Sequence, residues 1–291
     1  MSEIGFVGLG KMGLPMAGRL VDAGFRVRGY DPVDAARGAF ADIGGTVTDS
    51  AAAAAADVVI LMLPDSDVVD GVLFDGGVAA ALAAGSLIID MSSSAPLRSQ
   101  EVARRLDDLG VGFVDAPVSG GVSGAVAGTL TIMLGGDDAS AARATEVIEA
   151  LGAVRHVGPV GAGHALKALN NLLSATHLWA TSEAVLIGER FGLDPATMLD
   201  AINTSSGRSG STQKKWPDFV LPGTFDSGFS LALMLKDMRI ASDLAHSLNM
   251  PVALGDAAVQ RWADARDHLP DNADHTEIVR WLRHAAADTA H

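Results

Sequence analysis

Ile4-Gly5-Phe6-Val7-Gly8-Leu9-Gly10-Lys11-Met12-Gly13 is a short apolar run that leads directly into the pattern G-x-G-x-x-G. Between a strand and a helix, this pattern forms the turn that binds the pyrophosphate of a dinucleotide. The first glycine permits the tight turn, the second lets the backbone approach the pyrophosphate, and the third lets the following helix pack closely. The amides at the start of that helix attract the anion. The expected cofactor-binding residues of this turn are Gly8, Leu9, Gly10, Lys11, Met12 and Gly13.

The residues after the glycine pattern complete a strand–helix–strand unit. A helix is predicted from Leu14 to Ala23 and a second strand from Phe25 to Tyr30. Asp31 follows this strand, where dinucleotide-binding folds carry an acid that hydrogen-bonds the ribose hydroxyls. Because a carboxylate repels a 2′-phosphate, Asp31 favours NAD over NADP. Arg26 and Arg28 leave NADP possible, since an arginine turned toward the ribose tolerates the extra phosphate.

The composition indicates a two-domain protein of the cytoplasm. The chain has 291 residues, more than one domain usually holds, and 48% of them are hydrophobic. The net charge of −14 makes nucleic acid and anionic membranes unfavourable partners. No cysteine is present, which excludes disulfides, thiolate metal sites and a cysteine nucleophile. With no basic and apolar leader, and no apolar run of the roughly 18 residues that span a bilayer, we expect a soluble cytoplasmic protein.

The pattern of elements changes near residue 162. Before it, runs rich in Val, Ile and Leu alternate with helical stretches, which is typical of βαβ units around a parallel sheet. Further strands are expected at 58–63, 87–90, 112–115, 129–134 and 154–157, and a short helix at 51–56. We therefore predict an α/β protein with an N-terminal Rossmann-type doubly wound parallel sheet in residues 1–162 and a C-terminal all-α domain in residues 163–291.

A long helix is predicted to open the second half of the chain. Residues 164–191 keep helical periodicity, and at 1.5 Å per residue this helix is about 42 Å long, enough to run between two domains. Further helices are expected at 196–203, 231–248, 251–267 and 274–288, with loops marked by Pro217, Pro222 and Gly223. The apolar face of such a helical domain favours a homodimer or homotetramer.

Three further stretches carry groups suited to binding or proton transfer. In the loop 115–121, Ser119 supplies a hydroxyl, and the amides of Gly120 and Gly121 can form a nest for a carboxylate; a tight strand connection is the equal alternative. On the long helix, Lys167 and Asn171 share a face, and Asn170 and Ser174 extend this polar stripe. Buried polar groups must be paired or line a wet cleft, so a solvated face or a satisfied network is the ordinary alternative.

Two late segments add cationic side chains. Arg208 in Ser205-Ser206-Gly207-Arg208 can hold an acidic group in a fork, and Lys236 in Leu235-Lys236-Asp237 can approach the cofactor; surface charges are the alternative. His164 and His177 lie thirteen residues apart, which is no metal-ligand spacing, so we expect core or surface histidines and no metal. No nucleophile elbow is present, so covalent hydrolysis has no support.

In their order along nearly the whole chain, these stretches resemble the β-hydroxyacid dehydrogenase family, which includes 3-hydroxyisobutyrate dehydrogenase. The segment 5–17 is similar to the family's cofactor signature, and 115–121 followed by 128–130 to its substrate loop. The segment 163–171 is similar to its catalytic helix, and 235–237 to its late cofactor contact.

The resemblance implies an NAD(P)-dependent oxidoreductase acting on the CH–OH group of a small 3-hydroxy carboxylic acid such as 3-hydroxyisobutyrate. It implies that Lys167 is catalytic with Asn171 beside it, and that Ser119, Gly120 and Gly121 hold the substrate carboxylate. It also implies that Leu63, Pro64 and Ser93 contact NAD. Residues 203–208 look like the 3-hydroxyisobutyrate branch, but Gly210 stands where that branch often has an aromatic residue, so the exact substrate stays open.

Lys167 is the only basic group that these motifs place near the reacting hydroxyl, which predicts a general base in oxidation and a general acid in reduction. Two alternatives remain. One is an NADPH-dependent reductase of small semialdehydes (succinic, glyoxylic or tartronic type) or of imines; Asp31-Pro32 after the second strand argues against it. The other is a non-catalytic dinucleotide-binding protein, against which the presence of Lys167 and Asn171 argues.

Overall fold

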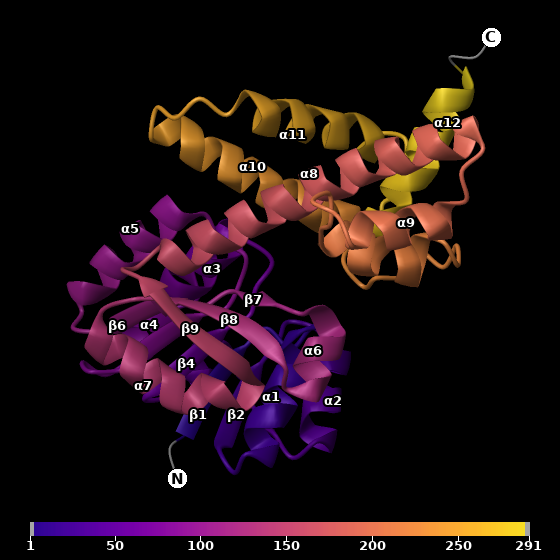
Figure 1. The fold of residues 1–291 in the computed structure, drawn as a ribbon. Helices are drawn as coiled ribbons and strands as arrows, with labels where there is room; N and C mark the ends of the chain where they lie inside the picture. The colour runs from indigo at the N-terminus through magenta and orange to yellow at the C-terminus, as the bar shows by residue number, and fades with distance from the viewer. Residues whose placement is uncertain (1–2, 289–291) are drawn as a thin grey trace. The chain divides into compact units, whose positions relative to one another are not determined.

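The computed structural model describes residues 3–288, which form two compact units that divide after Lys167 (Figure 1). The first unit is built on a sheet and the second on helices. Each has a hydrophobic core of its own.

The sheet of the first unit has nine strands in the order β3-β2-β1-β4-β5-β6-β8-β7, with β9 paired to β8. The strands are β1 (Glu3–Val7), β2 (Arg26–Tyr30), β3 (Thr46–Val47), β4 (Val58–Leu61), β5 (Leu87–Asp90), β6 (Gly112–Asp115), β7 (Val118–Ser119), β8 (Leu130–Gly135) and β9 (Gly152–Gly158). Neighbours from β3 to β6 are parallel, whereas β8 is antiparallel to β6 and β7. The doubly wound fold is confirmed, and it becomes mixed at β8 because the connection from β7 is too short for a parallel crossover.

Both faces of this sheet are covered by helices. Because side chains alternate along a strand, Phe6 and Ile60 enter one core, and Val7 and Val59 the other. The elements that cover the first face are α1 (Gly13–Asp22), α2 (Asp34–Asp42), α6 (Gly121–Ala127), α7 (Asp138–Ile148) and the 3-10 turn η3 (Glu149–Leu151). The elements on the other face are α3 (Ser66–Asp70), the π-helical η2 (Gly71–Asp75), α4 (Val78–Ala81), α5 (Pro96–Asp107) and the 3-10 turn η1 (Ala52–Ala54). The short helix expected at 51–56 is therefore limited to the single 3-10 turn η1.

Helix α8 (Ala162–Phe191) starts in the first unit and continues into the second. It is followed by α9 (Pro195–Asn203), the π-helical η4 (Ser211–Val220), α10 (Leu231–Ser247), α11 (Ala253–Arg266), the 3-10 turn η5 (His275–Glu277) and α12 (Ile278–Asp288). These elements pack around Trp216 and Trp262, which are both fully buried. Within residues 3–288, no helix is both long and apolar enough to cross a membrane.

One loop prediction is wrong. Pro217 lies inside η4 and does not mark a loop. The amide of Leu221 bonds to the carbonyl of Trp216 at 2.9 Å, an i to i+5 contact. This wider winding carries the chain past a proline that lacks an amide donor.

Candidate active site

The turn after β1 has the shape that a pyrophosphate requires. Gly8 has a φ of 98°, and a Cβ there would lie 2.3 Å from the carbonyl oxygen of Met62. A Cβ on Gly13 would lie 1.8 Å from the carbonyl oxygen of Gly8, so α1 packs directly on the turn. A Cβ on Gly10 would meet no atom within 4 Å. Room at Gly10, together with the uncapped start of α1, fits the close approach of an anion to backbone amides.

Asp31 lies at the end of β2 and is only 8% exposed. Its carboxylate accepts hydrogen bonds from the amides of Leu9 at 2.8 Å and Val33 at 2.9 Å. Each carboxylate oxygen retains a second acceptor position, which fits a ribose hydroxyl.

The arginines around Asp31 have partners within the first unit. Arg28 pairs with Glu3 at 3.6 Å and donates to the carbonyl of Ala53 at 2.7 Å. Arg37, which the sequence patterns do not single out, donates to the Asp31 carbonyl at 2.6 Å and pairs with Asp34. Arg28 is therefore turned toward Glu3 and Ala53, and Arg37 is the cation that contacts Asp31.

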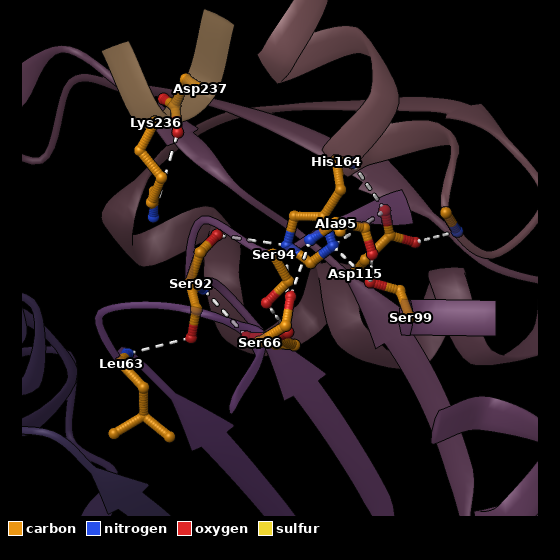
Figure 2. Close-up of polar contacts among 12 residues, drawn as sticks. Leu63, Ser66, Ser92, Ser94, Ala95, Ser99, Asp115, His164, Lys236 and Asp237 are labelled. Atoms are coloured by element: carbon orange, nitrogen blue, oxygen red, sulfur yellow. Dashed lines mark hydrogen bonds and ion pairs between the residues drawn. The ribbon is translucent and has the colours of Figure 1, made fainter. Parts of the chain in front are cut away.

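A buried hydrogen-bond network surrounds His164, in the first turn of α8 (Figure 2). The ring is 1% exposed, with Nδ1 2.7 Å from Ser99 Oγ and Nε2 3.1 Å from the carbonyl oxygen of Ser92. Because a carbonyl only accepts, Nε2 carries a proton, and in the neutral ring the Ser99 hydroxyl donates to Nδ1. His164 is thus a satisfied core histidine, as expected.

The same network anchors the start of α8 to the end of β6. Asp115 accepts from the amides of Gly161 and His164, each at 2.7 Å. Burial raises the pKa of the Asp115 carboxyl, and the neighbouring His164 partly offsets this rise. Asp115 begins the predicted substrate loop, and His164 precedes Lys167 by three residues. A buried contact therefore ties that loop to the predicted catalytic helix.

The network also joins the two segments predicted to contact the cofactor. After β5, Asp90 accepts from the Ser92 amide at 3.0 Å and from the Ser94 hydroxyl at 2.9 Å. Ser92 Oγ in turn accepts from the amide of Leu63 at 2.9 Å (Figure 2). Ser93 follows Ser92 and is half-buried. Leu63 and Ser93 therefore lie at adjacent strand ends.

The sequence patterns do not reveal this network. One signal was available: Asp90 and Asp115 each end a strand, and the ends of neighbouring parallel strands lie at one edge of a sheet. The hydroxyl and imidazole partners come from elsewhere in the chain, and no spacing rule connects them.

In the second unit, two of the predicted stretches meet. Asn171 Nδ2 donates to Asp237 Oδ2 at 2.6 Å, and both residues are buried. Asn170 donates to Asn171 Oδ1 at 3.1 Å, so the Asn171 amide is held from both sides. Lys236 Nζ lies 4.0 Å from Asp237 Oδ1 (Figure 2). Lys167, one helical turn before Asn171, is half-buried.

The remaining predicted residues lie on turns and strand ends. Ser119 ends β7, is half-buried, and pairs with Thr131 of β8. Gly120 and Gly121, with φ of 131° and 62°, lead into α6 in conformations that favour glycine. Arg208 is exposed in the turn after α9, and Pro64 is exposed after β4. Among the described residues, no cluster of three metal-binding side chains occurs.

Comparison with known proteins agrees with this architecture. The profile for the NAD binding domain of 6-phosphogluconate dehydrogenase matches residues 3–161. The profile described as NAD-binding of NADP-dependent 3-hydroxyisobutyrate dehydrogenase matches residues 161–282. Together the two profiles cover residues 3–282.

Relatives match over almost the full length. The chain is 38% identical to 2-(hydroxymethyl)glutarate dehydrogenase of Eubacterium barkeri, covering 96% of this chain and 94% of the relative. It is 39% identical to mitochondrial 3-hydroxyisobutyrate dehydrogenase of Homo sapiens, covering 97% and 87%. A solved structure of Mycobacterium tuberculosis 3-hydroxyisobutyrate dehydrogenase with L-serine has a TM-score of 0.91 at 37% identity, covering 97% and 99%. The chain therefore belongs to the β-hydroxyacid dehydrogenase family, as an NAD(P)-binding oxidoreductase that acts on the CH–OH group of its donor.

Proposed function

We propose that this enzyme oxidises the hydroxyl of a small 3-hydroxy carboxylic acid, such as 3-hydroxyisobutyrate, with NAD preferred over NADP and Lys167 as general acid and base. The observation that supports this most directly is the bond between Asn171 and Asp237 at 2.6 Å, one turn from Lys167. It fixes a buried amide one helical turn from Lys167, as a hydroxyl-orienting group requires.

In this proposal, residues 1–162 bind the cofactor. Gly8, Leu9, Gly10, Lys11, Met12 and Gly13 hold the pyrophosphate, Asp31 binds the ribose, and Leu63, Pro64 and Ser93 are further contacts. Lys236, outside this range, is proposed as a late cofactor contact. Bound NAD supplies the acceptor for the hydride. The retained acceptor positions of Asp31 support NAD, because a 2′-phosphate beside that carboxylate would be repelled.

Residues of this chain orient the substrate and move its proton. Ser119 and the amides of Gly120 and Gly121 bind the carboxylate, with Arg208 as a further anion-binding group. In oxidation, Lys167 Nζ accepts the proton of the hydroxyl as the neighbouring carbon loses its hydride; in reduction, it returns that proton. Asn171 orients the hydroxyl, with its own amide fixed by Asp237.

Replacing Lys167 tests this assignment. In Lys167→Ala, kcat should fall by about 10³-fold, because a positioned proton acceptor is lost. The dissociation constant for NAD, measured by calorimetry, should stay within about twofold, since Lys167 does not hold the pyrophosphate. A variant with near-normal kcat would show that another group moves the proton.

A substrate screen tests the reaction itself. Wild-type enzyme with each nicotinamide is offered 3-hydroxyisobutyrate, serine, glycerate, threonate and 4-hydroxybutyrate, and reduced cofactor is followed by absorbance. Faster reduction of small semialdehydes with NADPH would favour that alternative. Binding of NAD without turnover of any compound would favour a non-catalytic dinucleotide-binding protein.

We also propose that residues 163–291 mediate assembly into a homodimer or homotetramer. Exposed apolar side chains along α8 support it. The expected cytoplasmic address rests on the cysteine-free composition and stays a prediction.

A further inference from the structure

Lys215 of η4 is a half-buried cation whose amine has a neutral partner. Its Nζ donates to Ser174 Oγ at 2.6 Å. Among residues 3–288, no carboxylate lies within ion-pair distance of this amine. Burial lowers the pKa of Lys215 to about 8, which still leaves most of the amine protonated at neutral pH.

The nearest acid, Asp274, is already satisfied by neutral donors. It accepts from the Ser227 hydroxyl at 2.8 Å, the Gly228 amide at 2.9 Å, and the amide and hydroxyl of Thr276 at 2.9 and 2.6 Å. Its attraction only partly opposes the effect of burial on the pKa of Lys215. Asp274 therefore stabilises the loop before η5, and it compensates the charge on Lys215 only in part.

His275, the other ionisable neighbour, does not neutralise the charge of Lys215. Burial, reinforced by the charge of Lys215, lowers its pKa to about 4, so the ring is neutral at physiological pH. Its Nε2 is buried without a hydrogen-bond partner among the described residues. A partly desolvated cation beside a neutral ring is unfavourable in the free enzyme, and an anion that binds the amine would reduce that cost.

The position of Lys215 connects this charge to the proposed reaction. Ser174 follows Asn171 by three residues and Lys167 by seven, so the three share one face of the continuous helix α8. At 1.5 Å per residue, Ser174 lies about 4.5 Å beyond Asn171 along the axis and about 10.5 Å beyond Lys167. The amine therefore lies further along the face that carries the proposed catalytic pair.

We propose that Lys215 binds a second carboxylate of the substrate, so that the enzyme acts on 3-hydroxy acids whose C2 substituent ends in a carboxylate. This rests on the proposed function, because it assumes that the substrate hydroxyl lies at Lys167 and Asn171. One compound of this class is 2-(hydroxymethyl)glutarate, the molecule in the name of a relative 38% identical to this chain. It is 3-hydroxyisobutyrate with a carboxyethyl group in place of the methyl, so the two compounds differ only where Lys215 would act.

The test compares these compounds in three proteins. Wild-type enzyme should show a higher kcat/KM for 2-(hydroxymethyl)glutarate than for 3-hydroxyisobutyrate. In Lys215→Met, which keeps the length of the side chain, the ratio of the two values should fall about 30-fold, the loss of one charge-assisted hydrogen bond. The matched control is Lys214→Met, which removes the same charge from an exposed neighbour and should leave the ratio unchanged.

A pH series adds a readout that a packing defect would not move. In the wild type the ratio should fall as pH rises through about 8, because the Lys215 amine loses its proton. Asp274 and His275 are the ionisable groups that act on this amine. His275, whose pKa is about 4, stays neutral in that range. The ratio for Lys215→Met should be independent of pH. A ratio that Lys215→Met leaves unchanged, or that both variants lower equally, would overturn the proposal.

A binding measurement separates this proposal from the proposed function. Glutarate is titrated by calorimetry into enzyme with bound NAD, and no turnover is needed. Weaker binding in Lys215→Met than in Lys214→Met supports the carboxylate site even if neither hydroxy acid is oxidised, in which case only the proposed function fails. Equal binding in the two variants overturns the carboxylate site whatever the turnover.

Discussion

Asp31 is proposed to bind the ribose of the cofactor, and NADP differs from NAD by a 2′-phosphate on that ribose. Its two oxygens accept the amides of Leu9 and Val33, so the carboxylate is held in place. In Asp31→Ser, the ratio of kcat/KM with NADP to that with NAD should rise about 30-fold. The change weakens the ribose contact in NAD and removes the repulsion of the 2′-phosphate. Arg37, which donates to the backbone carbonyl of Asp31, would provide a nearby positive charge for that phosphate.

Asp34→Ser is the control for Asp31→Ser. Asp34 is exposed, pairs with Arg37 and lies three residues after Asp31, so this variant removes the same charge but keeps the carboxylate that binds the Leu9 and Val33 amides. Its cofactor ratio should change by no more than about twofold. An equal rise in both variants would mean that general surface charge, and not the Asp31 carboxylate, determines the preference.

Sequence alone can assign a residue's role when the contacts that determine the role lie within a few positions along the chain. The three glycines of the first turn are predictable because backbone geometry decides each one within a few residues. The partner of Asn171 is 66 positions away, that of Lys215 is 41 away, and the His164 ring contacts Ser92 across 72. Spacing rules describe neighbours on one element, so they place Lys167 and Asn171 on one face of a helix but cannot reveal Lys215 or the network around His164.

In the strand–turn–helix element at the start of the chain, substitutions at Gly10 and Gly13 should have different effects, one on cofactor binding and the other on stability. A Cβ on Gly10 meets open space, whereas a Cβ on Gly13 would lie 1.8 Å from the Gly8 carbonyl oxygen. Gly10→Ala should therefore keep its free energy of unfolding within about 0.5 kcal/mol while its affinity for NAD falls about 100-fold. Gly13→Ala should lose about 3 kcal/mol of stability or more, because α1 must move off the turn.

Denaturant unfolding and NAD calorimetry distinguish the two glycine variants. Gly10→Ala with normal NAD affinity would show that the pyrophosphate binds elsewhere. A fully stable Gly13→Ala would show that α1 does not pack as closely as described.

Elements differ in how well their sequences specify them. The parallel strands are continuous apolar runs because both of their faces are buried, and this made β4, β5 and β6 predictable. The direction of β8 depends on the length of its connection, which periodicity does not report. The π-helical winding of η4 was likewise hidden, because Pro217 ordinarily indicates a loop. That unpredicted element is the one that carries Lys215.

The whole chain has separate cores linked by one continuous helix. The clusters that flank the sheet lie in the first unit, and the tryptophan-centred cluster lies in the second. Asp115 and His164 fix the start of α8 at the edge of the sheet, while Asn171 and Ser174 engage α10 and η4 further along it. Lys167 lies between these two sets of contacts. Hydrogen bonds therefore hold α8 both before and after Lys167.

Helix α8 also has an exposed apolar stripe, which bears on assembly. Exposed apolar side chains share this stripe in two groups, Leu166, Leu169 and Leu173, then Ala180, Ala184, Ile187 and Phe191, with the exposed His177 between the groups. Ile187 is 69% exposed and Phe191 83%. Monomeric proteins rarely leave an apolar surface of this kind in water, and a second copy of the chain would bury it twice across a two-fold axis.

We therefore expect Ile187→Glu to dissociate the enzyme. In a two-fold contact the substitution places two new carboxylates at one interface, and sedimentation velocity should show the wild type as a dimer or tetramer and the variant as a single chain. Leu97→Glu is the control, because Leu97 is 51% exposed on α5 and lies outside the stripe. It should sediment like the wild type. A monomeric wild type, or an Ile187→Glu variant that remains assembled, would show that this stripe does not join copies of the chain.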